Sequence, residues 1–205
     1  MMRNIQIVCL LTLFLHLATI SDLSGQSWNL VKERDHIKLY TRVEVNGPLK
    51  SFKGVMDIQA DLEKINNMIG NPKDVKWWGK DVRGIKVLLF EENKHIQYYL
   101  IYDSPWPFTD RDIVADVQIT TDPSSGTRTI YSRPLLNVIP EYPDLIRVTH
   151  YWERWTIQPL NIGMIHLTFE GFIDPAGNIP AWLYNMLVIE TPLKLMREVQ
   201  KRVNK

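Results

Sequence analysis

The sequence has little cysteine, no excess of charge of either sign, and one long helical pattern. Its one cysteine, Cys9, lies in an N-terminal apolar run, so we expect no disulfide, cysteine-ligated metal or cysteine nucleophile in the rest of the chain. The chain carries 24 basic and 23 acidic residues, a formal net charge of +1. This balance gives no positive surface of the kind that binds nucleic acid, and no polybasic membrane patch.

The residue patterns of common catalytic sites are also missing from the sequence. It contains no nucleophile elbow of the Gly-x-Ser-x-Gly type, no phosphate-binding glycine loop and no dinucleotide fingerprint. His150 and His166 each lack a second histidine at metal-binding spacing. Glu170 and Glu190 could form a buried acid pair, but Glu190 stands four residues before Lys194 and suits a helix-surface ion pair better. We therefore expect no catalytic residue, no metal and no cofactor.

Residues 1–26 form a segment distinct from the rest of the chain. Arg3 precedes an apolar run from Ile5 to Ile20, and Ser21 to Gln26 are small or polar. This order is typical of a secretory signal peptide, and the run is shorter than the roughly 20 residues that span a bilayer. We expect export, to a periplasm or out of the cell; a retained membrane anchor is the alternative.

Residues 27–205 have the size of one globular domain. The clearest pattern of apolar residues in this domain lies near its C-terminus. Apolar residues recur there at steps of three and four: Trp182, Met186, Ile189, Leu193, Met196, Val199 and Val203. This spacing predicts an amphipathic helix over 180–203, starting at Pro180 and kinked at Pro192. The half before Pro192 is apolar nearly all round, so we expect a sheet to cover it.

The segments before this helix read mostly as strands. Alternating apolar and polar residues, bounded by turn residues, predict about nine of them: 28–32, 37–45, 50–59, 85–91, 95–102, 112–121, 127–135, 144–155 and 162–173. Two short helices, 61–69 with Asp61 as cap and 73–78, fall between the third and fourth strands. The fold class is α+β, a curved antiparallel sheet around one long helix. One helix against so many strands leaves apolar volume, which is the candidate ligand site.

Four segments, in order, resemble one known family. Residues 104–114, Ser-Pro-Trp-Pro-Phe-Thr-Asp-Arg-Asp-Ile-Val, and 174–185, Asp-Pro-Ala-Gly-Asn-Ile-Pro-Ala-Trp-Leu-Tyr-Asn, resemble two motifs of the START (StAR-related lipid transfer) family. The segments 36–42 and 155–163 are similar to two further motifs. The resemblance covers about 28–203. The departures are Ala176, where the family has the first glycine of a pair, and His36, where a glycine is usual.

The resemblance implies a helix-grip fold whose sheet and C-terminal helix enclose a tunnel for one lipid or other apolar molecule, without catalytic apparatus. Some family members place a buried acid and arginine in the tunnel wall. The aligned strand faces of this sequence have Tyr98 and Val117 near there, so that pair is not carried over and the head group of the ligand stays undefined.

Candidate site residues follow from the clean strand faces and the helix stripe, although each could simply be core. The candidates for ligand binding are Leu89, Tyr98, Leu100, Tyr102, Val117, Leu167, Phe169, Trp182, Met186 and Ile189. Trp106 and Phe108, in a loop stiffened by Pro105 and Pro107, are the candidate gate and suit a membrane interface. The alternative is that both rings plug the edge of the core. Arg111 and Asp112 are expected to be structural, tying the return of this loop to neighbouring backbone.

The function expected is non-catalytic binding, and possibly transfer, of a lipid or sterol-like molecule. An enzyme on the same fold, such as a polyketide-type cyclase or dehydratase, is one alternative, because a fold does not fix a function. A lipid-sensing scaffold is another. The partners expected are a hydrophobic small molecule and, transiently, a membrane, with no nucleic acid; the chain is expected to be a monomer.

Overall fold

The computed structural model describes residues 27–45 and 47–203, so the expected signal segment 1–26 lies outside the described residues. The elements, in chain order, are β1 (Asn29–Arg34), β2 (Ile37–Val43), β3 (Lys50–Gln59), α2 (Leu62–Met68), η2 (Lys76–Trp78), β4 (Val82–Glu91), β5 (His95–Tyr102), β6 (Arg111–Thr121), β7 (Arg128–Pro134), β8 (Ile146–Arg147), β9 (His150–Asn161), β10 (Met164–Asp174) and α3 (Ala181–Val203).

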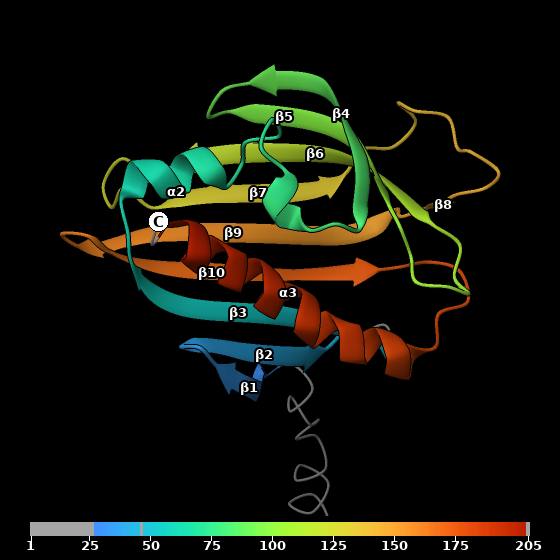
Figure 1. Cartoon of the computed structure of the whole chain (residues 1–205), viewed down its shortest axis with the longest axis horizontal. Coiled ribbons are helices and arrows are strands. Elements are labelled where there is room, and N and C mark those ends of the chain that lie inside the picture. The colour runs from blue at the N-terminus through green and yellow to red at the C-terminus, as the bar shows by residue number, and fades with distance from the viewer. Residues whose placement is uncertain (1–26, 46, 204–205) are drawn as a thin grey trace, which may run out of the picture.

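The strands form one sheet in the order β1-β2-β3-β10-β9-β7-β6-β5-β4, with β8 beside β6. Neighbours along this path are antiparallel, while β8 pairs with β6 in parallel. One face of the sheet, called the inner face below, is covered by α3 and by the segment containing α2 and η2 (Figure 1). The predicted α+β helix-grip architecture, with two short helices between the third and fourth strands, is confirmed.

Local sequence signals explain most element boundaries. In β2, Ile37, Leu39 and Thr41 are buried and Lys38 is exposed, which is the period of two expected for a sheet with one covered face. The Asp61 side chain accepts hydrogen bonds from the backbone nitrogens of Glu63 (2.7 Å) and Lys64 (3.2 Å). It therefore caps α2 as predicted.

The prediction of a single strand over 144–155 was wrong, because the segment is divided between β8 and β9. Arg147 donates to both carboxylate oxygens of Asp112 at 2.8 Å, and the backbone nitrogen of Val148 donates to Asp112 O at 3.0 Å. These bonds hold β8 against β6 before the chain enters β9 on another strand of the sheet. Alternation alone does not reveal such a change of partner, so the sheet has ten strands rather than about nine.

Helix α3 begins one residue later than predicted and stays helical through the buried Pro192. The backbone nitrogens of Leu183 and Tyr184 donate to Pro180 O at 3.0 and 3.1 Å, so Pro180 caps the helix rather than starting it. Among residues 27–45 and 47–203, no helix combines the length and apolar character needed to cross a bilayer.

The buried side of the first half of α3 is not the predicted one. Trp182 and Met186 are 71% and 53% exposed, whereas Tyr184 and Val188 are buried. The Tyr184 hydroxyl donates to Lys50 O (3.2 Å), and the Asn185 side chain accepts from the Lys50 nitrogen (3.1 Å). These bonds to β3 fix the rotation of the first half of α3. This half is apolar nearly all round, so its periodicity defines no single buried face. The prediction that the sheet covers Trp182 and Met186 was therefore wrong.

Candidate functional site

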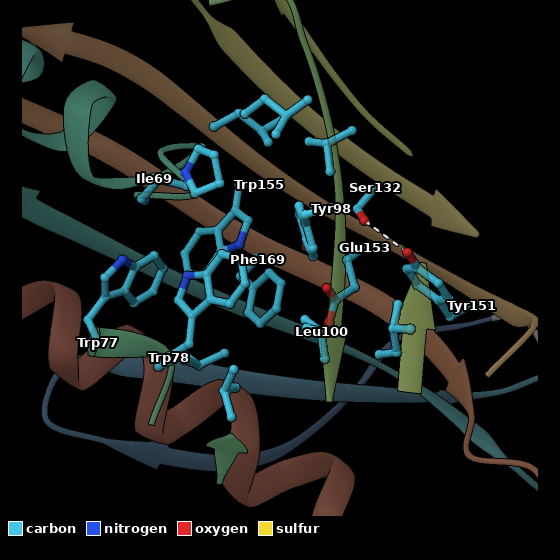
Figure 2. Close-up of a pocket in the computed structure, with 18 of the residues that line it drawn as sticks. Ile69, Trp77, Trp78, Tyr98, Leu100, Ser132, Tyr151, Glu153, Trp155 and Phe169 are labelled. Carbon is cyan, nitrogen blue, oxygen red and sulfur yellow. Dashed lines mark hydrogen bonds between the residues drawn. The ribbon is translucent and has the colours of Figure 1, made fainter. Parts of the chain in front are cut away.

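A cavity of about 210 Å³ lies between the inner face of the sheet, the segment around η2, and α3. Strands β4, β5, β6, β7, β9 and β10 contribute to its wall, and α3 contributes Thr191 and Leu195. The wall is mostly apolar and aromatic, as expected for a site that binds small apolar molecules. Figure 2 shows the wall residues converging on this space.

One end of the cavity is built from aromatic rings (Figure 2). Trp155 and Phe169, opposite each other on β9 and β10, stack with ring centroids 4.1 Å apart. Trp77 of η2 meets Trp155 edge to face at 6.1 Å, and Trp78 lies 5.5 Å from Tyr98. This end therefore offers a ligand the faces and edges of aromatic rings.

The other end is polar and is formed by Tyr98, Ser132, Tyr151 and Glu153 (Figure 2). The Ser132 and Tyr151 hydroxyls lie 3.3 Å apart, and the Tyr151 hydroxyl donates to Arg133 O at 3.0 Å. Burial, together with the charge of Glu153, raises the pKa values of Tyr98 and Tyr151 above their usual range. Both tyrosines therefore remain neutral at physiological pH.

Glu153 is the one charged residue in the cavity wall, and its position follows from the alternation of β9. It shares the inner face with Tyr151 and Trp155, opposite Ser132 of β7 and Gly171 of β10. A Cβ at position 171 would lie 3.2 Å from Glu153 Cγ, so glycine leaves room for this side chain. The part of Glu153 that stays accessible faces the cavity.

No hydrogen bond or ion pair of the Glu153 carboxylate is found within the described part of the chain. Burial alone raises the pKa of this carboxyl from 4.5 to about 7. Tyr98 and Val117 both line the cavity, and the sequence analysis missed Glu153. The signal was present: in Tyr-Trp-Glu-Arg-Trp, residues 151–155, the glutamate falls on the same strand face as a tyrosine and a tryptophan.

The structure brings half of the predicted ligand-binding residues to the cavity. Those that line it are Tyr98, Leu100, Tyr102, Val117 and Phe169. Those that do not are Leu89, Leu167, Trp182, Met186 and Ile189. Leu167 is fully buried in the core, and Leu89 and Ile189 are half-buried outside the wall. Ligand contact by the first five stays a prediction.

The candidate gate residues lie in the loop 103–110, outside the cavity wall. Trp106 is 92% exposed, so the alternative that it plugs the core edge is wrong for this ring; Phe108 is half-buried. Arg111 is buried and donates to Ser104 Oγ (3.2 Å), Pro175 O (3.2 Å) and Thr109 O. Arg111 therefore ties this loop to the segment that leads into α3.

Two kinds of catalytic site have no support in the described residues. No group of three or more His, Cys, Asp or Glu side chains within 27–45 and 47–203 could hold a metal ion. His166 lies on the other face of the sheet and contacts Asp57 at 2.6 Å, and His150 is exposed. Neither histidine lines the cavity with Glu153.

Glu153→Gln should stabilise the ligand-free protein at about pH 8 and leave its stability nearly unchanged at about pH 4. Because the folded-state pKa is raised from 4.5 to about 7, the folded protein binds this proton more tightly than the unfolded chain. The free energy of unfolding of the wild type therefore falls as the pH rises from the unfolded-state pKa through the folded-state pKa, by roughly 3 kcal/mol in total. Thermal unfolding of both proteins across this range measures the effect; parallel pH profiles would contradict it.

Comparison with known proteins identifies relatives and the fold. No family model matches the chain. An uncharacterized protein of Pseudomonas aeruginosa is 30% identical over 182 residues, covering 88% of this chain and 89% of that protein. The phosphatidylcholine transfer protein of Bos taurus is 25% identical over 169 residues, covering 80% and 78% of the two chains.

Two solved structures have a fold similar to that of this chain. A STAR-related lipid transfer protein from Xanthomonas axonopodis superposes with a TM-score of 0.77 at 24% identity, covering 87% of this chain and 99% of that one. Human StAR-related lipid transfer protein 5 gives 0.76 at 18% identity, covering 92% and 91%. The resemblance predicted from four sequence motifs is confirmed. The chain belongs to one family with the Pseudomonas aeruginosa protein, and it has the helix-grip fold of the StAR-related lipid transfer proteins.

Proposed function

We propose that this protein binds one lipid or similar apolar molecule in the cavity and carries it without chemical change. The observation that carries the proposal is a ring-lined cavity between the sheet, the segment around η2 and α3, in a fold shared with proteins named for lipid transfer. The relationship to a phosphatidylcholine transfer protein supports the same function class. Transfer, sensing and storage of the ligand all agree with this arrangement.

The size of the cavity bears on how a ligand enters. Its volume of about 210 Å³ is below the roughly 300–1,000 Å³ of typical small-molecule sites. A long lipid therefore requires the cavity to widen, and we infer that α3 moves. Surface ion pairs hold this helix at its sides, Lys32 with Glu190 and Lys194 with Asp81 (3.3 Å). Such exposed pairs contribute little stability and can be exchanged for water.

We further propose that the protein contacts a membrane transiently through the loop 103–110 and the outward side of α3. Arg111 links this loop to Pro175 and Ala176, just before α3, so the loop and the helix start are neighbours. Both lie at the same end of the molecule in Figure 1. Trp106 and Trp182, 92% and 71% exposed, are the ring type that favours the interface between water and lipid.

Native mass spectrometry of protein purified from an exporting host tests the proposed function and the export proposed from residues 1–26. We expect a chain shortened by about 26 residues, monomeric, with one apolar molecule per chain, because the predicted signal peptide is removed on export. Uncleaved protein would argue against export only. Mature protein that neither retains nor takes up an apolar molecule would contradict ligand binding.

Replacing Leu195 with Trp should fill the cavity and reduce ligand uptake, because Leu195 reaches the cavity from α3. Met186→Trp on the same helix is the matched control, since Met186 is 53% exposed and lies outside the wall. Uptake of a fluorescent fatty alcohol, measured beside thermal unfolding, separates lost volume from lost folding. Equal uptake by the two variants would place the ligand elsewhere.

Replacing both Trp106 and Trp182 with Ser should slow lipid transfer between vesicles several-fold while leaving equilibrium ligand binding intact. Both rings are exposed, so we expect the free energy of unfolding to change by no more than about 0.5 kcal/mol. Ile162→Ser is the control, because Ile162 is an exposed apolar residue beside the opposite end of β10. A transfer rate equal to that of the control variant would rule out membrane contact through these rings.

A second candidate function, acid–base catalysis on a bound ligand, is favoured by one observation. A carboxyl whose pKa is near 7 is suited to proton transfer at neutral pH. Mass spectrometry of ligand recovered from the wild-type protein and from Glu153→Gln distinguishes the two functions. A carrier returns the same molecule from both; a molecule altered only by the wild type would establish an enzyme.

A further inference from the structure

We propose that the ligand of this cavity carries a cationic head group, a protonated amine or another organic cation, and that Glu153 is its acceptor. The proposal rests on ligand binding in the cavity as proposed above and adds the chemical class of the head group. Glu153 thereby becomes the residue that selects and orients the ligand.

The charges around the cavity support a cationic ligand. Glu153 is the single acid in the wall, and the wall contains no Lys, Arg or His. On β9 itself, the adjacent Arg154 lies on the outer face, where it pairs with Glu170 of β10 at 3.2 Å. A carboxylate enclosed without a cation is costly, and a ligand that supplies the cation removes that cost.

The other elements packed around Glu153 present no cation to it either. Strand β7 places Ser132 opposite it, β5 contributes Tyr98, and α3 contributes Thr191 and Leu195. Arg133, the next residue of β7, pairs with Asp116 of β6 at 3.1 Å on the outer face. A ligand ending in a carboxylate or a phosphate would face Glu153 with like charge. The site therefore discriminates by the sign of the head-group charge.

The rings beside Glu153 favour the same class of ligand. Figure 2 shows the carboxylate between the Trp155 and Phe169 rings on one side and the Ser132–Tyr151 pair on the other. Aromatic faces attract cations, most strongly where water is displaced. The Ser132 hydroxyl can accept a further hydrogen bond from an ammonium group. A cation at this end would thus meet a carboxylate, rings and a hydroxyl oxygen.

The opposite end of the cavity fixes the orientation of the ligand. Trp77, Trp78 and Ile69 form an apolar end without a charged side chain in the wall. The polar head therefore lies at Glu153, and the apolar part extends toward η2. A neutral head, such as a hydroxyl, could also donate to Glu153, but it would leave the carboxylate charge uncompensated.

Three probes with the same chain and different heads test the proposal: decylamine, decanol and decanoate. At about pH 8, where Glu153 is ionised, decylamine should bind at least about tenfold more tightly than decanol, which is the range of a hydrogen bond to a charged group. Decanoate should bind most weakly. Quenching of tryptophan fluorescence follows binding, because three tryptophans line the cavity.

The variant Glu153→Gln measures the contribution of the carboxylate charge to ligand affinity. We expect this variant to bind decylamine at least about tenfold less tightly and decanol within about threefold of the wild type. Decylamine affinity of the wild type should fall from about pH 8 to about pH 5.5 as the carboxyl takes up its proton, and the variant should lack this change. Glu170→Gln is the matched control, since Glu170 lies on the neighbouring strand and on the outer face.

Equal affinity of the wild type for decylamine and decanol would overturn the proposal while leaving ligand binding itself in place. Unchanged decylamine affinity in Glu153→Gln would overturn it as well. If none of the three probes binds and the mature protein carries no apolar molecule, the proposed function fails together with this inference. The comparison of probes on the wild type decides the question even if a variant does not fold.

Discussion

The contact between α3 and β3 determines which part of the inner face is closed and which part stays hollow. Two hydrogen bonds hold the start of the helix on β3: the Tyr184 hydroxyl donates to Lys50 O, and the Lys50 backbone nitrogen donates to the Asn185 side chain. Farther along, Met196 packs where Gly54 has no side chain, so the helix approaches the strand closely. A helix is only about 10 Å across, so one helix held on this side cannot also fill the space under β5, β6 and η2.

The cavity that remains contains a group that a well-packed core would avoid. The Glu153 carboxylate in its wall has neither a cation nor a hydrogen bond in the described part of the chain. The buried pair of Asp112 and Arg147 shows how the same protein pairs a charge whose role is structural. The contrast distinguishes a charge that stabilises the fold from the charge that we propose binds a ligand.

Much of the fold followed from local sequence signals, because β3 and β5 have clean alternation and definite turn residues at both ends. The cap at Asp61 was likewise readable from one side chain. The features of the fold that the sequence did not predict depend on contacts between residues far apart in the chain. Strand β8 exists because Arg147 pairs with Asp112, and the rotation of α3 depends on Tyr184 meeting Lys50. Glu153 could in principle be predicted from the alternation of β9, but its lack of a charged partner depends on the absence of cations from the seven other described elements of the wall.

Trp182 and Met186 were predicted to be covered by the sheet, and their exposure has a physical consequence. Burying Tyr184 and Val188 leaves two large apolar side chains, Trp182 and Met186, exposed to solvent, and the start of this helix lies at the same end of the molecule as the loop that carries Trp106 (Figure 1). Full burial of such side chains stabilises a protein by about 1.5–3 kcal/mol each. The observed rotation of α3 therefore lacks the stabilisation that burial of these two side chains would give. This exposure supports the membrane contact that we propose for the outward side of α3. The helix that closes the cavity is therefore also the element best placed to respond when that surface is covered.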